Sequence, residues 1–173
     1  MNKLIQWLLE SNSISIPTLY HISFNGNLEK IWYPQNPAGS NFSSKNNATT
    51  EPDLPRISTS DSLEKCFQAI YPNVYRYFEE ENYPYMEFYV YSPILNGNEK
   101  ILVPEELTRL KYVHDAHMTN EYCILTPVFM KKVMKIRIKN TNKNKFLKYK
   151  EFGTGKERSF APDNIIVKVI EKY

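Results

Sequence analysis

Apolar residues recur with a period of two in several short segments of the chain. Met86, Phe88 and Val90 alternate with more polar neighbours, which predicts a strand over residues 85–91 with one buried face. Residues 134–138 repeat the pattern, and their basic neighbours Lys135 and Arg137 are expected to point outward. Similar short runs predict strands over 18–24, 56–60, 101–103, 122–126 and 165–170.

A period of about 3.6 appears clearly in one place. Leu63, Cys66, Phe67 and Ile70 fall at i, i+3, i+4 and i+7, which predicts a helix that lays one face on the core. Asp61 precedes it as the expected N-cap, with Glu64 three positions later, and Pro72 is expected to end it. Weaker patterns predict an N-terminal helix within residues 1–16 and a short helix that starts at Pro104.

These elements together indicate the fold class. Strands follow one another with few helices between them, and parallel pairing would need longer helical crossovers. The expected architecture is therefore α+β, with a mainly antiparallel split sheet and a few short helices. The chain has 173 residues, which fits a single domain over 1–173. Residues 33–55 are rich in Asn, Ser, Thr and Pro, and we expect a long binding or lid loop there.

Composition indicates where in the cell the protein is expected and what kind of partner it would bind. No apolar run is long enough to span a membrane, so we expect a cytoplasmic protein with Cys66 and Cys123 reduced. The net charge of +3 is unevenly spread: residues 1–130 hold nine Lys and Arg against fifteen Asp and Glu, whereas residues 131–150 hold nine Lys and Arg and no acid. An anionic partner should meet the segment 131–150 first.

Three segments carry candidate chemistry. They are Leu19-Tyr20-His21-Ile22-Ser23 on the first strand, Ser58-Thr59-Ser60 between a strand and a helix, and Asn120-Glu121-Tyr122-Cys123-Ile124-Leu125 at the start of a later strand. In this order and in these contexts they resemble the three signature segments of the ADP-ribosyltransferase fold. That family includes poly-ADP-ribose polymerases and diphtheria-type toxins, which split NAD and transfer or release ADP-ribose.

The resemblance implies roles for two residues. His21 is similar to the first-strand histidine that hydrogen-bonds a ribose hydroxyl of NAD in the His-Tyr-Glu group. Glu121 is similar to the carboxylate that grips the nicotinamide ribose. A fixed anion suits this chemistry because its attraction strengthens as positive charge appears on the breaking glycosidic bond. An imidazole on a rigid strand supplies a directional donor or acceptor to the sugar.

The middle segment departs from that pattern. Ile57 stands where the group has a tyrosine that stacks on nicotinamide, and Ser58-Thr59-Ser60 resembles a sister group instead. Stacking is then open to Tyr33, Tyr71 or Tyr122. The catalytic residues implied are Glu121 and His21, and the residues expected to bind NAD are His21, Ser23, Arg56, Ser58, Thr59, Ser60, Tyr71 and Tyr122.

Three functions follow from these observations. The first is transfer of ADP-ribose from NAD to a protein or nucleic-acid acceptor, or release of nicotinamide. The second is a non-catalytic bacterial or phage protein that captures an ADP-ribose-type nucleotide in defence or anti-defence signalling, which the missing tyrosine favours. The third is nucleic-acid binding through Lys132, Lys135 and the rest of residues 131–150.

Structural interpretations stand beside each functional one. His21 would then be a hydrogen-bonded strand histidine, Ser58-Thr59-Ser60 helix-entry hydroxyls, and Glu121 a solvated residue. The lysines along 134–138 would keep an edge strand from pairing. His114, His117 and Glu121 have a spacing that suits zinc only on a helix, and we expect a loop there and no metal.

Overall fold

The computed structural model describes residues 15–36, 54–70, 83–113, 115–140, 147–150, 157–160 and 165–173. Three predicted features lie largely or wholly outside the described residues: the N-terminal helix within 1–16, of which residues 15 and 16 alone are described, most of the 33–55 loop, and Tyr71 with Pro72. Within them the protein is mixed α and β, and all its strand pairs are antiparallel. The predicted α+β class is confirmed.

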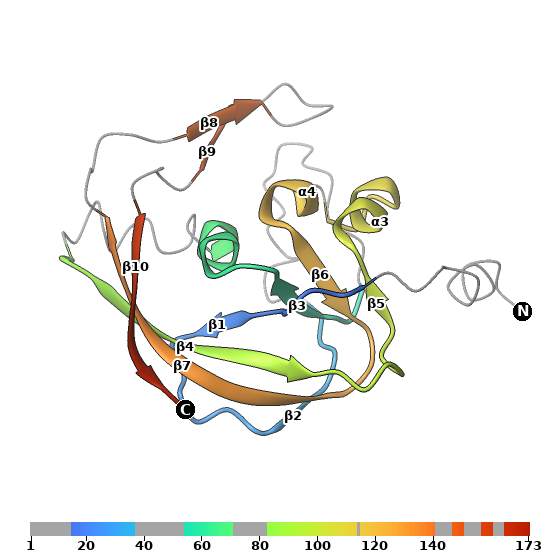
Figure 1. Ribbon diagram of the computed structural model, residues 1–173. Coiled ribbons are helices and arrows are strands. Elements are labelled where there is room, and N and C mark those ends of the chain that lie inside the picture. The colour runs from blue at the N-terminus through green and yellow to red at the C-terminus, as the bar shows by residue number, and fades with distance from the viewer. Residues whose placement is uncertain are drawn as a thin grey trace, which may run out of the picture.

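The larger sheet has the order β1-β4-β7-β10, with β2 paired to the other end of β7 (Figure 1). Its strands are β1 (His21–Ser23), β2 (Ile31–Trp32), β4 (Met86–Ile94), β7 (Val128–Asn140) and β10 (Ile165–Lys172). β7 lies between β4 and β10, so the interpretation of its lysines as protection for an edge strand is wrong. The alternation itself is confirmed, because Ile136 and Ile138 are fully buried.

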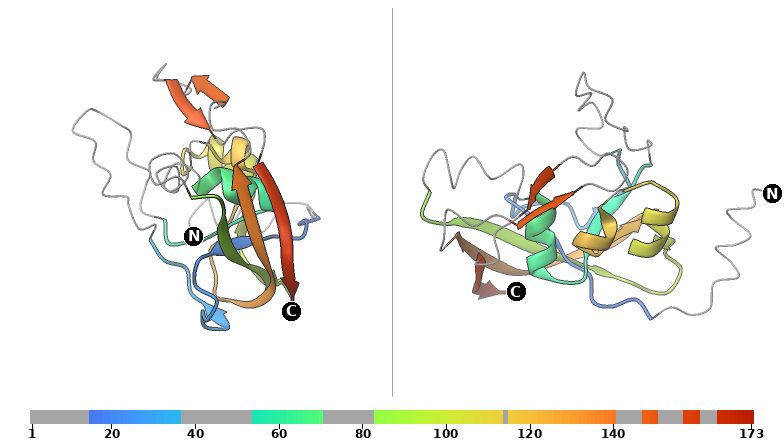
Figure 2. Two further views of the ribbon diagram at one scale, coloured as in Figure 1. Left: turned by 90° about the vertical axis from the view of Figure 1, so that its left-hand side faces the viewer. Right: turned by 90° about the horizontal axis from the view of Figure 1, so that it is seen from above.

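The smaller sheet has the order β3-β6-β5 and consists of β3 (Ile57–Ser60), β6 (Glu121–Ile124) and β5 (Ile101–Leu102). Two short helices, α3 (Pro104–Arg109) and α4 (Ala116–Thr119), lie together beside β6 (Figure 2). They bury a core cluster that includes Leu102, Leu107 and Cys123. Apart from both sheets, β8 (Leu147–Lys150) pairs with β9 (Glu157–Phe160).

The helix over residues 63–70 covers one face of the larger sheet. Cys66 and Phe67 are buried in the main core against strand residues such as Phe88 and Ile136, as the spacing predicts. The predicted N-cap is off by one residue: the Lys65 amide donates to Ser62 Oγ at 3.3 Å, and Asp61 instead accepts from Asn120 Nδ2 at 3.0 Å. The prediction of a loop at 114–117 is wrong in part, since α4 includes His117.

Candidate functional site

Both ends of β3 are tied to the segment that runs from β1 to beyond β2. At one end Tyr20 and Ser60 exchange two backbone hydrogen bonds of 2.8 and 2.9 Å. At the other end Gln35 and Arg56 exchange two more, of 2.9 and 3.1 Å. Residues 20–35 therefore leave β3 and return to it, and the two sheets meet along this line. We call this junction the seam.

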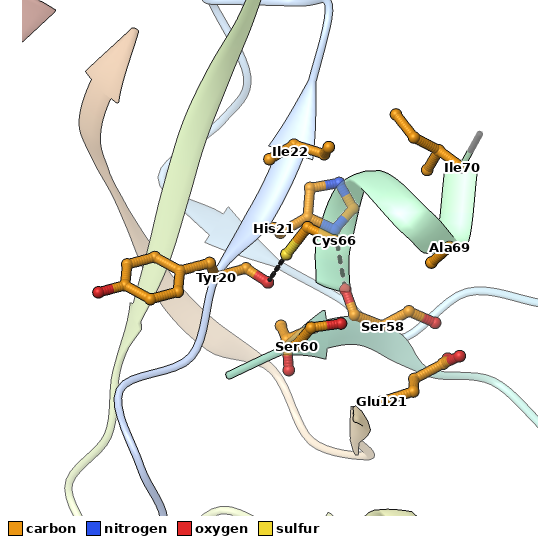
Figure 3. A pocket seen from close by; sticks show the side chains of 10 residues that line it. Tyr20, His21, Ile22, Ser58, Ser60, Cys66, Ala69, Ile70 and Glu121 are labelled. Atoms are coloured by element: carbon orange, nitrogen blue, oxygen red, sulfur yellow. Dashed lines mark hydrogen bonds between the residues drawn. The ribbon is translucent and has the colours of Figure 1, made fainter. Parts of the chain in front are cut away.

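A small cavity of about 80 Å³ lies on the seam beneath the helix over residues 63–70. His21 borders it from β1, Ser58 and Ser60 from β3, and Glu121 from β6 (Figure 3). The cavity therefore brings together the two residues proposed as catalytic, although they are a hundred positions apart in sequence. Its remaining lining is Tyr20, Ile22, Thr59, Cys66, Ala69 and Ile70.

The hydrogen bond of His21 fixes which nitrogen of its ring carries the proton. Nδ1 lies 2.8 Å from the Ser58 carbonyl oxygen, which only accepts, so Nδ1 is the protonated nitrogen and donates (Figure 3). Burial lowers the pKa of His21 below its usual 6.5, against the raising effect of this hydrogen bond. The ring is therefore neutral at pH 7, and the lone pair on its Nε2 makes that atom a hydrogen-bond acceptor.

Glu121 is held at the start of β6, directly opposite Ser60 in the register. Its side chain is 12% exposed, and its Oε1 lies 3.7 Å from Nε of the buried Arg56 side chain. Residues 56, 58 and 60 share one face of β3, because side chains alternate along a strand. Arg56 therefore places a positive charge beside the carboxyl group at the cavity wall.

A larger pocket of about 470 Å³ lies on the same seam and shares His21 and Ser58 with the small cavity. Apolar and polar side chains both line it, and Trp32 is one of the apolar ones. The Trp32 ring donates from Nε1 to the Glu29 carbonyl at 2.7 Å and packs against His21 and Tyr91 at centroid distances of 4.8 and 5.3 Å. The other lining residues are Leu28, Glu29, Ile31, Tyr33, Gln35, Asn36, Arg56 and Ile57.

Of the remaining residues predicted to bind NAD, some line a cavity and others do not. Thr59 lines the small cavity, but its hydroxyl donates to the Tyr122 carbonyl at 3.0 Å. Ser23 and Tyr122 are not among the described residues that line either cavity, and Ser23 Oγ accepts from the Asn25 amide instead. Burial and, to a lesser degree, Asp61 raise the pKa of the Tyr122 hydroxyl.

The larger pocket contains residues that the sequence reasoning missed. Trp32 and Gln35 belong to a segment without clear periodicity, so no pattern marked them. A signal was nevertheless present, because Trp32-Tyr33 follows the His21 strand at loop distance and such loops often carry binding residues. Of the proposed stacking residues, Tyr33 lines this pocket and is 60% exposed.

No group of three or more His, Cys, Asp or Glu side chains suited to a metal ion occurs within the described ranges. The same part of the chain holds no helix of the length and apolar character that crossing a membrane requires. Comparison with protein-family models, curated proteins and solved structures finds no match to this chain.

Proposed function

We propose that this protein has an ADP-ribosyltransferase-like fold, binds NAD or an ADP-ribose-type nucleotide along the seam, and transfers ADP-ribose or releases nicotinamide. The observation that carries the proposal is the small cavity, where the His21 imidazole and the Glu121 carboxylate converge from different sheets. The larger and the smaller antiparallel sheet, which meet at the seam, also agree with the split sheet that the resemblance implies.

The two side chains have complementary abilities. Glu121 supplies a fixed negative charge, and this charge would stabilise the cation that forms on the ribose as nicotinamide leaves. Neutral His21 offers the lone pair of Nε2 to a ribose hydroxyl, while its donation to Ser58 holds the ring in place. Arg56 fixes Glu121 from the side of the larger pocket.

The sizes of the two cavities decide how a dinucleotide would lie. A volume of about 80 Å³ holds a few water-sized groups, such as one edge of a ribose. The larger pocket, at about 470 Å³, falls within the range of roughly 300–1,000 Å³ that is typical of small-molecule sites. The bulk of the ligand would therefore occupy the larger pocket, with its sugar reaching past His21 toward Glu121.

The direct test combines binding with chemical analysis of the ligand. We expect NAD, ADP-ribose or cyclic ADP-ribose to raise the melting temperature, and mass spectrometry of the recovered NAD to show released nicotinamide. Glu121→Gln should reduce release about a hundredfold or more, as loss of a charge-stabilising group commonly does. The exposed Glu105→Gln is the matched control and should behave as wild type. No release under any condition, with Glu121→Gln equal to wild type in binding, would refute the proposal.

A second candidate is capture of the nucleotide without cleavage, and one observation favours it. Ile57, at the position where the resemblance expects a stacking tyrosine, is 5% exposed and packs in a core cluster with Tyr91 and Ile124. The position where the resemblance expects a stacking ring therefore holds an aliphatic side chain that packs in the core. This candidate predicts tight binding with the ligand recovered intact, whereas recovery of cleaved products would exclude it.

A further inference from the structure

One face of the larger sheet, away from the helix over residues 63–70, carries a group of basic and aromatic side chains. We call it the outer face. β7 supplies Lys132, Lys135, Arg137 and Lys139, and Lys168 lies beside Arg137 on β10. Only two carboxylates of the described residues lie among them in the register, Glu87 beside Arg137 and Glu171 beside Lys135. The outer face is therefore net positive.

Tyrosine rings lie between these cations. The Arg137 guanidinium is 4.1 Å from the ring centroid of Tyr85, and Lys132 Nζ is 4.5 Å from that of Tyr173. Lys132 and Lys135 approach the Tyr89 ring at 5.4 and 5.7 Å. Tyr85 and Tyr173 are 40% and 48% exposed, so part of each ring remains open to solvent.

The position of β7 in the sheet makes this arrangement informative. Basic side chains on an edge strand are explained by protection against further pairing, but β7 pairs on both sides. Glu87 holds Lys135 at 2.7 Å and Arg137 at 2.6 Å, and it lowers their mutual repulsion without removing the excess positive charge. Three cations thus follow one strand at positions 135, 137 and 139, about 7 Å apart.

We propose that the outer face binds single-stranded nucleic acid. Cations spaced along a strand can pair with successive phosphates, and exposed tyrosine rings can stack on unpaired bases. An open antiparallel sheet that presents aromatic rings is a recurrent way of binding single strands. In a duplex the base faces are covered by neighbouring base pairs, and an acidic polypeptide has no bases. Stacking on the tyrosine rings therefore favours a single strand over these other polyanions. This surface adjoins the 20–35 segment, because Lys132 Nζ donates to the Gly26 carbonyl at 3.0 Å.

The test is fluorescence anisotropy of the full chain with labelled single strands of about 12 nucleotides, the length that one such surface can hold. A deoxyuridine strand and a uridine strand differ in the sugar alone and identify the preferred one, and binding of either supports the proposal. A duplex and polyglutamate are the comparison ligands, and both should bind at least about tenfold more weakly. Equal binding of a single strand and either comparison ligand would overturn it.

Two variants separate charge from stacking. Lys139→Gln/Lys168→Gln should flatten the dependence of log affinity on log salt by about 1.4, because two phosphate contacts are lost. Tyr85→Ser/Tyr173→Ser should weaken binding about tenfold or more with little change in that slope. Lys100→Gln/Lys111→Gln removes the same charge from exposed positions on the other sheet's side and is the control. Equal losses in the face variants and the control would refute the assignment, as would absence of binding at low salt.

Discussion

His21 donates from Nδ1 to the Ser58 carbonyl and, in the proposed function, accepts from a ribose hydroxyl at Nε2; two substitutions separate these roles. An asparagine amide nitrogen lies close to where Nδ1 lies in histidine, so His21→Asn keeps a donor for the Ser58 carbonyl and loses the Nε2 acceptor. A glutamine amide reaches the Nε2 position, so His21→Gln keeps a polar group in the cavity and loses the donor to Ser58. We expect Asn to impair nucleotide binding more than stability and Gln to do the reverse.

The expected magnitudes follow from the contacts. Both variants lose the edge-on packing of His21 on Trp32, with ring centroids 4.8 Å apart, worth about 0.5–1.5 kcal/mol. His21→Gln also leaves the Ser58 carbonyl without its side-chain donor, at about 1–3 kcal/mol. The free energy of unfolding should therefore fall by about 1 kcal/mol in the Asn variant and by about 2–4 kcal/mol in the Gln variant.

The pH dependence gives an independent check. Because burial holds the pKa of folded His21 below 6.5, the unfolded chain takes up this proton at a higher pH than the folded one. The contribution of neutral His21 to stability is therefore complete above its unfolded pKa, and it is lost as the pH falls from there through the folded pKa. The stability advantage of wild type over His21→Asn should shrink between about pH 7 and pH 5.

Urea unfolding followed by circular dichroism, at a series of pH values, measures both effects. Nucleotide binding by the same two variants is measured at pH 7.5 or about that value, where the imidazole is neutral. The reasoning would be refuted by equal destabilisation in the two variants, or by parallel pH profiles for wild type and His21→Asn. Equal destabilisation would mean that Nδ1 does not donate to Ser58, and parallel pH profiles would mean that folding does not lower the pKa of His21.

Three further predictions concern stability and reactivity. Gly26→Ala places a Cβ 2.6 Å from the Tyr89 ring, so we expect a loss of about 1–3 kcal/mol in urea unfolding, and no loss would contradict this packing. Phe67→Ala empties a fully buried site and should cost about 3–5 kcal/mol by the same measurement, whereas a loss below about 1 kcal/mol would count against it. Burial raises the pKa of the Cys66 thiol to about 12. A thiol reagent at mildly alkaline pH should therefore label Cys66 only in denaturant. Rapid labelling of Cys66 in the native protein would show that the core is open.

The sequence predicted well those elements in which buried apolar residues recur at a regular spacing. The faces of β4 and β7 and the buried face of the 63–70 helix follow the alternation and the i, i+3, i+4 spacing, because those residues pack in one core. The N-cap was misplaced because Asp61 and Ser62 are both good caps, and the choice depends on Asn120, which lies 59 positions away.

The candidate site was predictable only in part. The convergence of His21 and Glu121 on one cavity agrees with the order of the motifs, but the link to Ser58 depends on strand pairing between distant segments. Trp32 was missed because a two-residue strand in a loop leaves no periodic signal. The interior position of β7 was missed for a similar reason: alternation reports which face is buried and does not report which strands flank it.

The seam also has a mechanical consequence. The long β4–β7 ladder pairs nine residues, whereas the two bridges on β3 contribute four backbone hydrogen bonds between the sheets. A small molecule bound between Trp32 and Glu121 would contact both sheets and link them. Ligand binding would then reduce local opening at the seam far more than within either sheet. The unliganded protein would open locally along this line.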